Sequence, residues 1–265
     1  MIDQRQIDDF EKHGVICLRG YFIDWVEVLR DGIEKLIRNP SPRERSYVPQ
    51  DGSAPFFQDL CNWQRIQEFE DFIFNSNAGE IASKLMKSKT SRFFHDHVLV
   101  KEPGSSIVTP WHQDQSYYCT SGFQTISFWI PLDTVTEETT LNCISGSHLW
   151  NKLHKPKRFD GTDLFENDNS EDVPDIDNNA DDYNILSWPL HAGDAIGFNF
   201  RTLLILLSAT FLANPKAINA DNASFFIVLS ILSNKRSELF SVLIFFIYYI
   251  SVSYTHLTLP TKRIV

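Results

Sequence analysis

His112 and Asp114 are the two side chains of this chain whose types and spacing are best suited to metal chemistry. One residue separates them, so on an extended strand both side chains point to the same side. An imidazole nitrogen and a carboxylate oxygen can then converge on one divalent ion. Together with a distant histidine they would form the facial triad that holds non-haem Fe(II) and leaves coordination positions open. No third ligand is evident in the sequence.

The His-x-Asp spacing alone is a weak signal, because it occurs by chance in many proteins. A hydrogen-bonded pair on the surface of a sheet is the simpler interpretation of these two residues taken by themselves. The rest of the chain has to decide between a metal site and an ordinary strand.

Length, charge and cysteine usage limit the class of protein. The chain has 265 residues, enough for one large β domain or two small ones, and a formal net charge of −10. Nucleic acid and anionic membranes would be repelled on average, so neither is an expected partner. The four cysteines are far apart and form no CxxC pair, which favours reduced thiols in a cytosol-like compartment. The N-terminus has no apolar core of a secretory signal, so we expect a cytoplasmic location and leave a peroxisomal one open.

The first part of the chain has helical patterns. Residues 2–14 place apolar side chains on one face and end at Gly14, and residues 22–38 repeat apolar residues at helical spacing until Pro40. A short strand is expected between them, at residues 15–18. Residues 51–75 carry many aromatic side chains and are expected to be helical or irregular.

From Phe93 onward the pattern becomes that of strands. Runs of β-branched and aromatic residues at 93–100, 125–132 and 195–200 are bounded by Gly, Pro and Asp. Helices followed by many strands predict an α+β fold, mainly β, with the helices on one side.

Two later stretches differ in character. The acidic segment 159–183 contains little that could fill a core and predicts a solvated insertion. A calcium loop there would need the central Gly and closing Glu of an EF-hand, which are missing. After Thr202 come long apolar runs, of which 239–250 is shorter than the roughly 20 residues that cross a bilayer, so we expect no membrane anchor.

A set of motifs between residues 93 and 203 resembles the phytanoyl-CoA dioxygenase family. The motifs are Val100-Lys101-Glu102-Pro103-Gly104, Thr109-Pro110-Trp111-His112-Gln113-Asp114-Gln115, Phe128-Trp129-Ile130-Pro131-Leu132-Asp133, Ser145-Gly146-Ser147-His148, Gly193-Asp194-Ala195-Ile196-Gly197-Phe198 and Arg201-Thr202-Leu203. They stand in the order of the family, and the resemblance covers roughly residues 5–203, with the N-terminal part less specific.

The resemblance implies a double-stranded β-helix, a cupin-like jelly roll with flanking N-terminal helices. It implies Fe(II) and 2-oxoglutarate, with His112 and Asp114 as metal ligands. It also places Trp129, Gln113 and His97 beside the co-substrate, although core packing would explain Trp129 and an ordinary strand histidine would explain His97. The implied reaction uses molecular oxygen to decarboxylate 2-oxoglutarate and to hydroxylate a small organic or acyl substrate.

The sequence departs from the family pattern in two places. Leu204 stands where the family's distal histidine is expected, and a leucine cannot donate to a metal. Pro215, with Lys216 beside it, stands where an arginine is expected to pair with the far carboxylate of 2-oxoglutarate, and lysine reproduces that bidentate clamp poorly. His148 and His191 are weak substitutes for the third ligand, because neither occupies the matching strand position.

One explanation covers both departures. The match stops at Leu203, and residues 252–261 resemble the translation of an adapter used in sequencing libraries. We therefore predict an incomplete dioxygenase-like domain at residues 1–203, truncated before its last strands. Residues 204–265 would be an unrelated apolar tail produced by read-through or adapter translation.

Two function classes follow. The first is a Fe(II)- and 2-oxoglutarate-dependent dioxygenase as the parent protein, with the present chain inactive because the distal histidine and the arginine are missing. The second is a non-catalytic β-helix that serves as a binding module. No obligate protein partner is evident, and the substrate is not encoded in any motif of the sequence.

Overall fold

The computed structural model describes residues 1–50, 52, 54–101, 109–158, 161–166, 168–206 and 224–233. They belong to one compact unit, Met1–Asn234, whereas the unit Lys235–Val265 lies outside the described residues. The elements are α1 (Gln4–His13), β1 (Val15–Leu18), η1 (Ile23–Trp25), α2 (Val26–Arg38), β2 (Phe56–Leu60), α3 (Gln67–Asn75), α4 (Ala78–Leu85), β3 (Ser91–Lys101), η2 (Asp114–Tyr117), β4 (Thr125–Pro131), β5 (Leu141–Ile144), η3 (Ser147–Leu149), η4 (Asp177–Asp182), β6 (Ile185–Leu186), β7 (Ala195–Phe198), β8 (Leu204–Leu206) and β9 (Ser224–Ser233).

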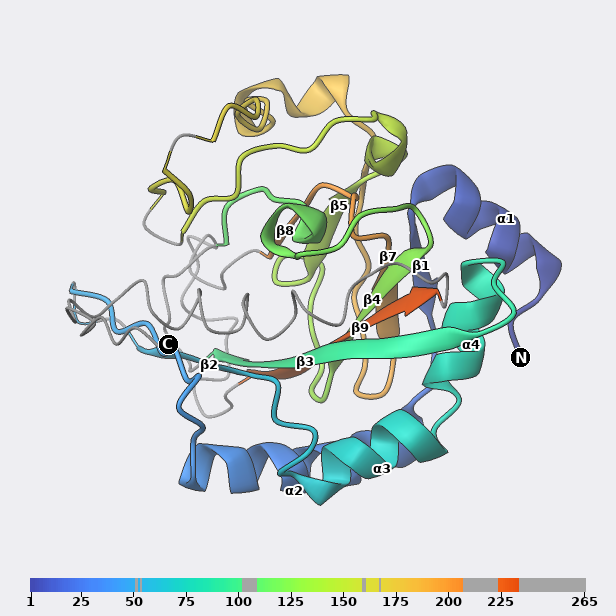
Figure 1. Ribbon diagram of the computed structural model, residues 1–265, viewed down its shortest axis with the longest axis vertical. Helices are drawn as coiled ribbons and strands as arrows, with labels where there is room; N and C mark the ends of the chain where they lie inside the picture. The colour runs from blue at the N-terminus through green and yellow to red at the C-terminus, as the bar shows by residue number, and fades with distance from the viewer. Residues whose placement is uncertain are drawn as a thin grey trace, which may run out of the picture. The chain divides into compact units, whose positions relative to one another are not determined.

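Two antiparallel sheets form the centre of the unit (Figure 1). The large sheet has the strand order β1-β7-β4-β9-β3-β2, and the small sheet has the order β6-β5-β8. An isolated bridge between His112 and Leu204 adds the residues around His112 to the free side of β8. The two sheets face each other, which gives the double-stranded β-helix that the sequence predicts.

The first helix begins and ends where the sequence signals it. Asp3 and Gln6 form a capping box at the start of α1, and Gly14 ends the helix with a left-handed φ of 71°. The predicted helix over residues 22–38 is divided into η1 and α2, and the region 51–75 contains β2 as well as α3.

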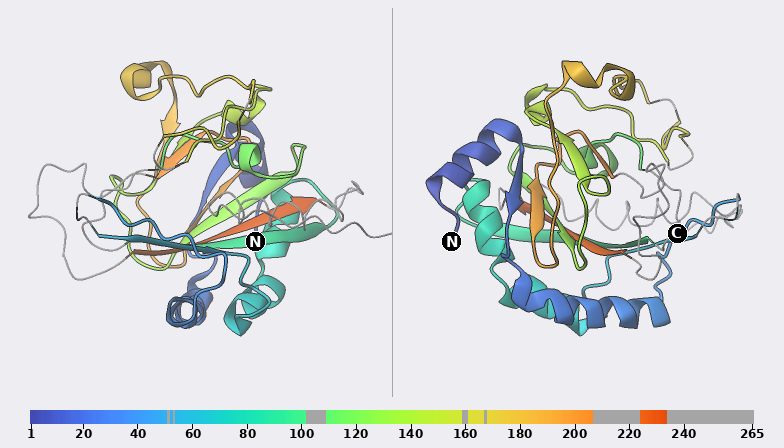
Figure 2. Two further views of the ribbon diagram at one scale, coloured as in Figure 1. Left: turned by 60° about the vertical axis from the view of Figure 1, so that its left-hand side comes forward. Right: turned by 180° about the vertical axis from the view of Figure 1, so that it is seen from behind.

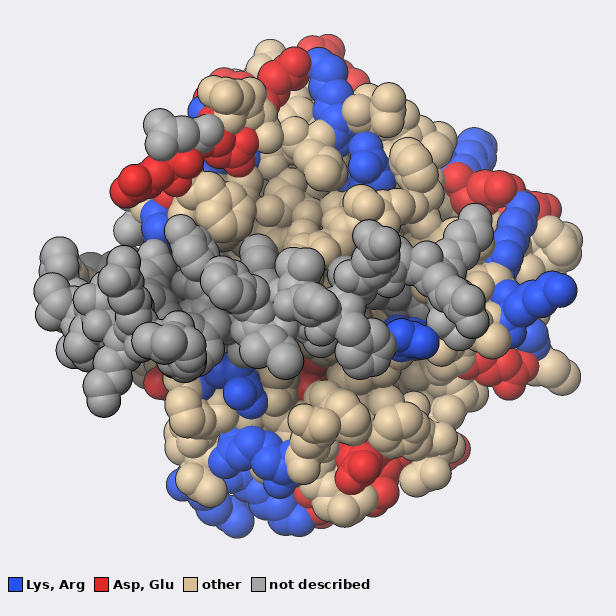
Figure 3. Space-filling model, viewed as in Figure 1, with Lys and Arg blue, Asp and Glu red and all other residues tan. Residues whose placement is uncertain are grey.

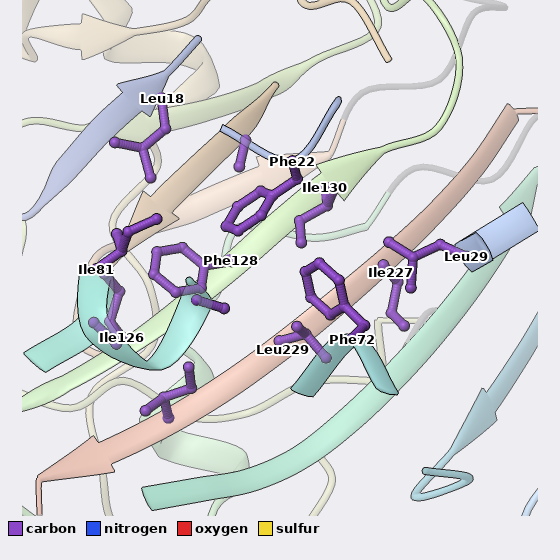
Figure 4. Packing of buried hydrophobic residues seen from close by; sticks show 14 of the residues in the cluster. Leu18, Phe22, Leu29, Phe72, Ile81, Ile126, Phe128, Ile130, Ile227 and Leu229 are labelled. Atoms are coloured by element: carbon purple, nitrogen blue, oxygen red, sulfur yellow. The ribbon is translucent and has the colours of Figure 1, made fainter. Parts of the chain in front are cut away.

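One face of the large sheet packs against the helices. Alternate residues of its central strands, such as Phe128 on β4 and Leu229 on β9, share a core with α2, α3 and α4. Phe22 links the layers, because its ring lies 5.4 Å from Phe72 of α3 and 5.9 Å from Phe128 (Figure 4). The period of two along each strand sends the remaining side chains to the opposite face.

That opposite face encloses a second core together with the small sheet. Trp129 of β4 and Val228 of β9 cluster there with Cys143 of β5 and Leu204 of β8. Because strands of both sheets contribute to this core, it fills the inside of the β-helix. The side chains of His112 and Asp114 belong to the same interior.

The acidic segment covers the outer face of the small sheet. Ile176, which is 1% exposed, packs there with Ile144 of β5 and Leu203, and Trp111 lies against this cluster. The segment lies on the side of the molecule away from α2 and α3 (Figure 2), and its acidic side chains gather at one edge of the face in Figure 3. The predicted insertion is therefore charged on its outside and anchored by an apolar contact on its inside.

The structure confirms the predicted fold class, a mainly β double-stranded β-helix with flanking N-terminal helices. Two strands nevertheless lie beyond residue 203, since β8 completes the small sheet and β9 lies between β4 and β3 in the large one. The origin of the chain from residue 204 stays a prediction, and Pro215, Lys216 and the apolar run 239–250 lie outside the described residues.

Two further expectations concern surface and thiols. Among the described residues, no helix is long and apolar enough to span a membrane. All four cysteines are free, and burial raises the pKa of Cys17 to about 11 and of Cys61 to about 12.

Candidate metal and co-substrate site

His112 and Asp114 converge inside the β-helix, as their spacing predicts. Nε2 of His112 lies 3.7 Å from Oδ1 of Asp114. Two backbone hydrogen bonds of 2.9 Å, in which His112 and Leu204 each donate to the other, hold the backbone at His112 against β8. Two donors at this separation are close enough to bind one divalent ion, because typical bond lengths to such an ion are about 2.0–2.2 Å.

Hydrogen bonds orient both donor atoms. Nδ1 of His112 lies 2.8 Å from the carbonyl of Pro110. A carbonyl can only accept, so Nδ1 donates to it, and Nε2 is the ring nitrogen left to face a metal. On Asp114 the other oxygen, Oδ2, accepts from Ser127 Oγ at 2.9 Å and from Tyr118 OH at 3.3 Å, which leaves Oδ1 directed at His112.

Burial dominates the electrostatics of this pair. Asp114 is 9% exposed, and desolvation raises the pKa of its carboxyl, while His112, Ser127 and Tyr118 act in the opposite direction. Burial and the neighbouring Asp114 together hold the pKa of Tyr118 well above its usual range. The hydroxyl groups therefore stabilise a carboxylate that water reaches poorly.

Two sets of directly paired residues on β3, β9 and β4 line the interior of the β-helix. Val228 of β9 is the direct partner of both His97 on β3 and Trp129 on β4, and two residues along, Ser230 is the partner of His95 and Ser127. Direct partners in an antiparallel sheet point to the same face. The sequence-predicted residues His97 and Trp129 thus share the interior with the metal pair, although no contact with a co-substrate is tested.

Both histidines of β3 favour the neutral form. Burial lowers the pKa of His95 to about 4, and burial with the nearby His95 and His112 lowers that of His97 to about 3. Nε2 of His97 lies 3.3 Å from Gln58 Oε1. Neutral imidazoles beside the metal pair add polarity to the interior without adding charge.

Leu204 occupies the position opposite His112. As the direct cross-strand partner of His112, its side chain projects to the same face, and it is 3% exposed within the apolar core of Trp129 and Val228. Across the described residues, no group of three or more His, Cys, Asp or Glu side chains is arranged to hold a metal ion. Two donors therefore suit ferrous iron, but the set is incomplete at residue 204.

Neither weak substitute completes the set. His148 points at α1, where its Nε2 lies 3.2 Å from the carbonyl of Glu11. His191 is at the turn before β7, where its backbone N–H donates to Asp194. The structure thus agrees with the expectation that neither replaces the distal histidine.

Gln113 points away from the metal pair. Its side chain is 1% exposed, its amide nitrogen donates to the carbonyls of Arg201 at 2.7 Å and Lys152 at 3.3 Å, and its oxygen accepts from His154 N–H at 3.0 Å. These bonds occupy its polar atoms within the protein. Its predicted contact with the co-substrate remains untested and has no support from this geometry.

Sequence reasoning missed four residues around the pair: His95, Tyr118, Ser127 and Ser230. A period of two along the predicted strands would have found His95 from His97 and Ser127 from Trp129. Tyr118 and Ser230 carry no such signal, because one follows a turn and the other lies in the segment interpreted as foreign.

The family model for phytanoyl-CoA dioxygenase (PhyH) matches residues 10–203. The chain belongs to the phytanoyl-CoA dioxygenase family. No curated protein matches the chain.

Solved structures share the fold of this phytanoyl-CoA dioxygenase family member. The non-heme alpha ketoglutarate dependent carbocyclase SnoK from nogalamycin biosynthesis is 16% identical with a TM-score of 0.67, over 88% of this chain and 84% of that one. The epimerase SnoN in complex with Fe3+, alpha ketoglutarate and nogalamycin RO is 17% identical with a TM-score of 0.67, over 91% and 88%. EvdO2 from Micromonospora carbonacea var. aurantiaca, complexed with 2-oxoglutarate, is 20% identical with a TM-score of 0.60, over 88% and 91%.

Proposed function

We propose that this chain has the scaffold of a Fe(II)- and 2-oxoglutarate-dependent dioxygenase that hydroxylates a small organic or acyl substrate, and that the chain with Leu204 does not turn over 2-oxoglutarate. Family membership and the convergence of His112 with Asp114 support the first part. The leucine in direct register with His112 supports the second. No iron-dependent step is assigned to the chain as it stands.

The register of Leu204 is the observation that carries the proposal. The backbone at residue 204 already pairs with the backbone of His112, as a third ligand there would require. Replacing the single side chain of Leu204 would therefore supply the missing donor. A histidine at this position would face the interior beside Nε2 of His112 and Oδ1 of Asp114. The three side chains together should then bind a divalent ion.

The test is metal binding by the variant Leu204→His. We expect L204H to bind Co(II), a spectroscopic substitute for Fe(II), with a dissociation constant about 10-fold or more below that of the unmodified chain, measured by calorimetry and visible absorption. Leu206→His is the matched control, because Leu206 is also buried on β8 but is the partner of Leu141 and not of His112. Equal affinity of both variants would contradict the proposed site.

Turnover gives a separate check on inactivity. The unmodified chain, incubated with Fe(II), 2-oxoglutarate and oxygen, should form no succinate above a control without protein, as measured by mass spectrometry. Robust succinate formation would refute the claim that this chain is inactive.

A non-catalytic binding module is the second candidate. The observation that favours it is the apolar surrounding of Leu204, which shares a core with Trp129, Val228 and Cys143 where an enzyme of this family would need a donor. A chain of this kind would bind 2-oxoglutarate or a small acid without metal and without turnover. Calorimetry with 2-oxoglutarate in the presence of a chelator separates it from the first candidate.

A further inference from the structure

We propose that Gln113 is a positioning residue, which fixes the extended segment of His112 and Asp114 by tying it to residues 152–154 and to the turn before Leu204. The inference concerns Gln113 itself and rests on the proposed function only where metal affinity is used as a readout.

The backbone is extended at Gln113, so the side chains of residues 112, 113 and 114 alternate in direction. His112 and Asp114 face the interior, whereas Gln113 between them faces outward, toward residues 152–154, which are bonded in turn to the acidic segment. The residue between two metal ligands is thus placed to restrain both without touching the ion. Any shift of its backbone moves the two donors together.

Gln113 joins three separate parts of the chain. Its amide nitrogen donates to Lys152 and Arg201 carbonyls, and its oxygen accepts from the backbone of His154. Arg201 lies in the turn that leads into β8. The side chain of Gln113 therefore connects the segment of His112 and Asp114 with the strand of Leu204. Because Gln113 is almost fully buried, each lost bond would leave an unsatisfied polar group out of reach of water.

Two neighbouring side chains add ties, one to the acidic segment and one to Lys157 just before it. Nε1 of Trp111 donates to Asp177 Oδ1 at 2.8 Å. The hydroxyl of Tyr117 donates to the carbonyl of Lys157 at 2.7 Å and accepts from the N–H of the same residue at 3.0 Å. Hydrogen bonds therefore restrain this segment at Trp111 before His112, at Gln113 between the two donors, and at Tyr117 after Asp114.

Lys152 and His154 are in turn bonded to the acidic segment. Nδ1 of His154 donates to the carbonyl of Asp172 at 3.0 Å, and Lys152 forms an ion pair of 2.8 Å with Glu171. Ile176 anchors its far end in the apolar cluster on the small sheet. The partner of Gln113 is thus a fixed part of the structure, which is what a positioning contact requires.

Hydrogen–deuterium exchange on the full chain tests the proposal. The variant Gln113→Met keeps the volume and removes all three bonds. We expect exchange of the amides of His112 and Gln115, which bond to β8 and its preceding turn, to accelerate about 10-fold or more, with no change in β3 and β4. Gln115→Met is the matched control, because Gln115 is also buried but, among the described residues, its side chain bonds only to the nearby carbonyl of Thr120, so exchange at the amide of His112 should stay unchanged.

Metal affinity in the L204H background is the second readout. Adding Gln113→Met should weaken Co(II) binding by about 10- to 100-fold relative to L204H alone, the range typical of contacts that orient metal ligands. If L204H itself binds no cobalt, the proposed metal centre is wrong and exchange alone decides the role of Gln113.

Three results would overturn the proposal. These are unchanged exchange in the Gln113→Met variant, a uniform rise in exchange over the whole chain, and a local rise with unchanged cobalt affinity. If Gln113→Met does not fold, Gln113→Asn replaces it, because it keeps an amide in the polar site and its shorter side chain cannot reach all three partners; local acceleration at His112 would then support the tie and its absence would contradict it.

Discussion

At the scale of residues, hydrogen bonds orient both members of the pair His112 and Asp114. Nδ1 of His112 is fixed by a carbonyl, and Oδ2 of Asp114 is fixed by the hydroxyls of Ser127 and Tyr118. Such contacts are those that orient metal ligands in other proteins. Leu204 stands opposite His112, and among the described residues no third His, Cys, Asp or Glu side chain joins the pair in a group that could hold a metal ion.

The buried His95 gives a prediction about pH. Its Nδ1 is enclosed without a hydrogen-bond partner among the described residues, and burial lowers its pKa to about 4, below the value of about 6.5 of an unfolded chain. Between these values the unfolded state binds the proton, so His95 costs stability as the pH falls from 6.5 toward 4, by up to about 1.4 kcal/mol per pH unit.

The variant His95→Gln isolates this contribution, because glutamine does not titrate. Urea unfolding from pH 7.5 to 4.5 should show the free energy of unfolding falling more steeply for the unmodified chain than for His95→Gln. Asp96, whose pKa burial raises to about 6, acts in the opposite direction but is present in both chains and cancels. Parallel curves would show that His95 is not buried in the neutral form.

At the scale of elements, the junction of α1 with η3 depends on one glycine. Gly14 has a φ of +71°, and a Cβ on it would lie 2.3 Å from Nδ1 of His148. The carbonyl of Gly14 also accepts from Asn199 N–H and from the hydroxyl of Thr202, both at 2.8 Å. His148, which the sequence offered as a weak metal ligand, instead packs against the end of α1.

Two alanine substitutions separate conformation from packing at this junction. Gly20 has a similar φ of +68° but nothing within 4 Å of its Cβ position, so Gly20→Ala should cost about 1–2 kcal/mol for the left-handed backbone alone. Gly14→Ala should cost about 1–3 kcal/mol more, because His148 must move. Chemical denaturation measures both, and equal losses would show that His148 yields freely.

At the scale of the whole molecule, the end of the folded unit is the open question. The sequence resemblance ends at residue 203, whereas the compact unit extends to Asn234 because β9 pairs with β3 on one side and with β4 on the other. Without β8 and β9 the small sheet loses an edge and the large sheet is divided, which exposes unpaired strand edges to aggregation.

Truncation decides between the two boundaries. A chain of residues 1–234 should be monomeric in size-exclusion chromatography and should unfold cooperatively by circular dichroism. A chain of residues 1–203 should aggregate or unfold without a cooperative transition. If the shorter chain is as well folded as the longer one, the boundary predicted from the sequence is right and β9 is dispensable.

The sequence by itself determined the elements and the chemistry of single residues. The helix at Gln4–His13 follows from its apolar face and Gly14, and β3, β4 and β7 follow from their runs of β-branched and aromatic residues, whereas β2, β5, β6 and α4 were not predicted. The pair His112 and Asp114 follows from a spacing that the extended backbone at Gln113 converts into a shared direction. All of these are short-range properties, fixed within a few residues of the chain.

Only the tertiary structure decided which distant residues meet. It placed Leu204 opposite His112, brought Ser127 to Asp114 and Ser230 to Ser127, directed Gln113 to residues 152–154, and gave residues 224–233 a place between β4 and β3. Strand register and sheet order set these contacts, and both depend on pairing between segments about 100 residues apart, for which no local pattern exists.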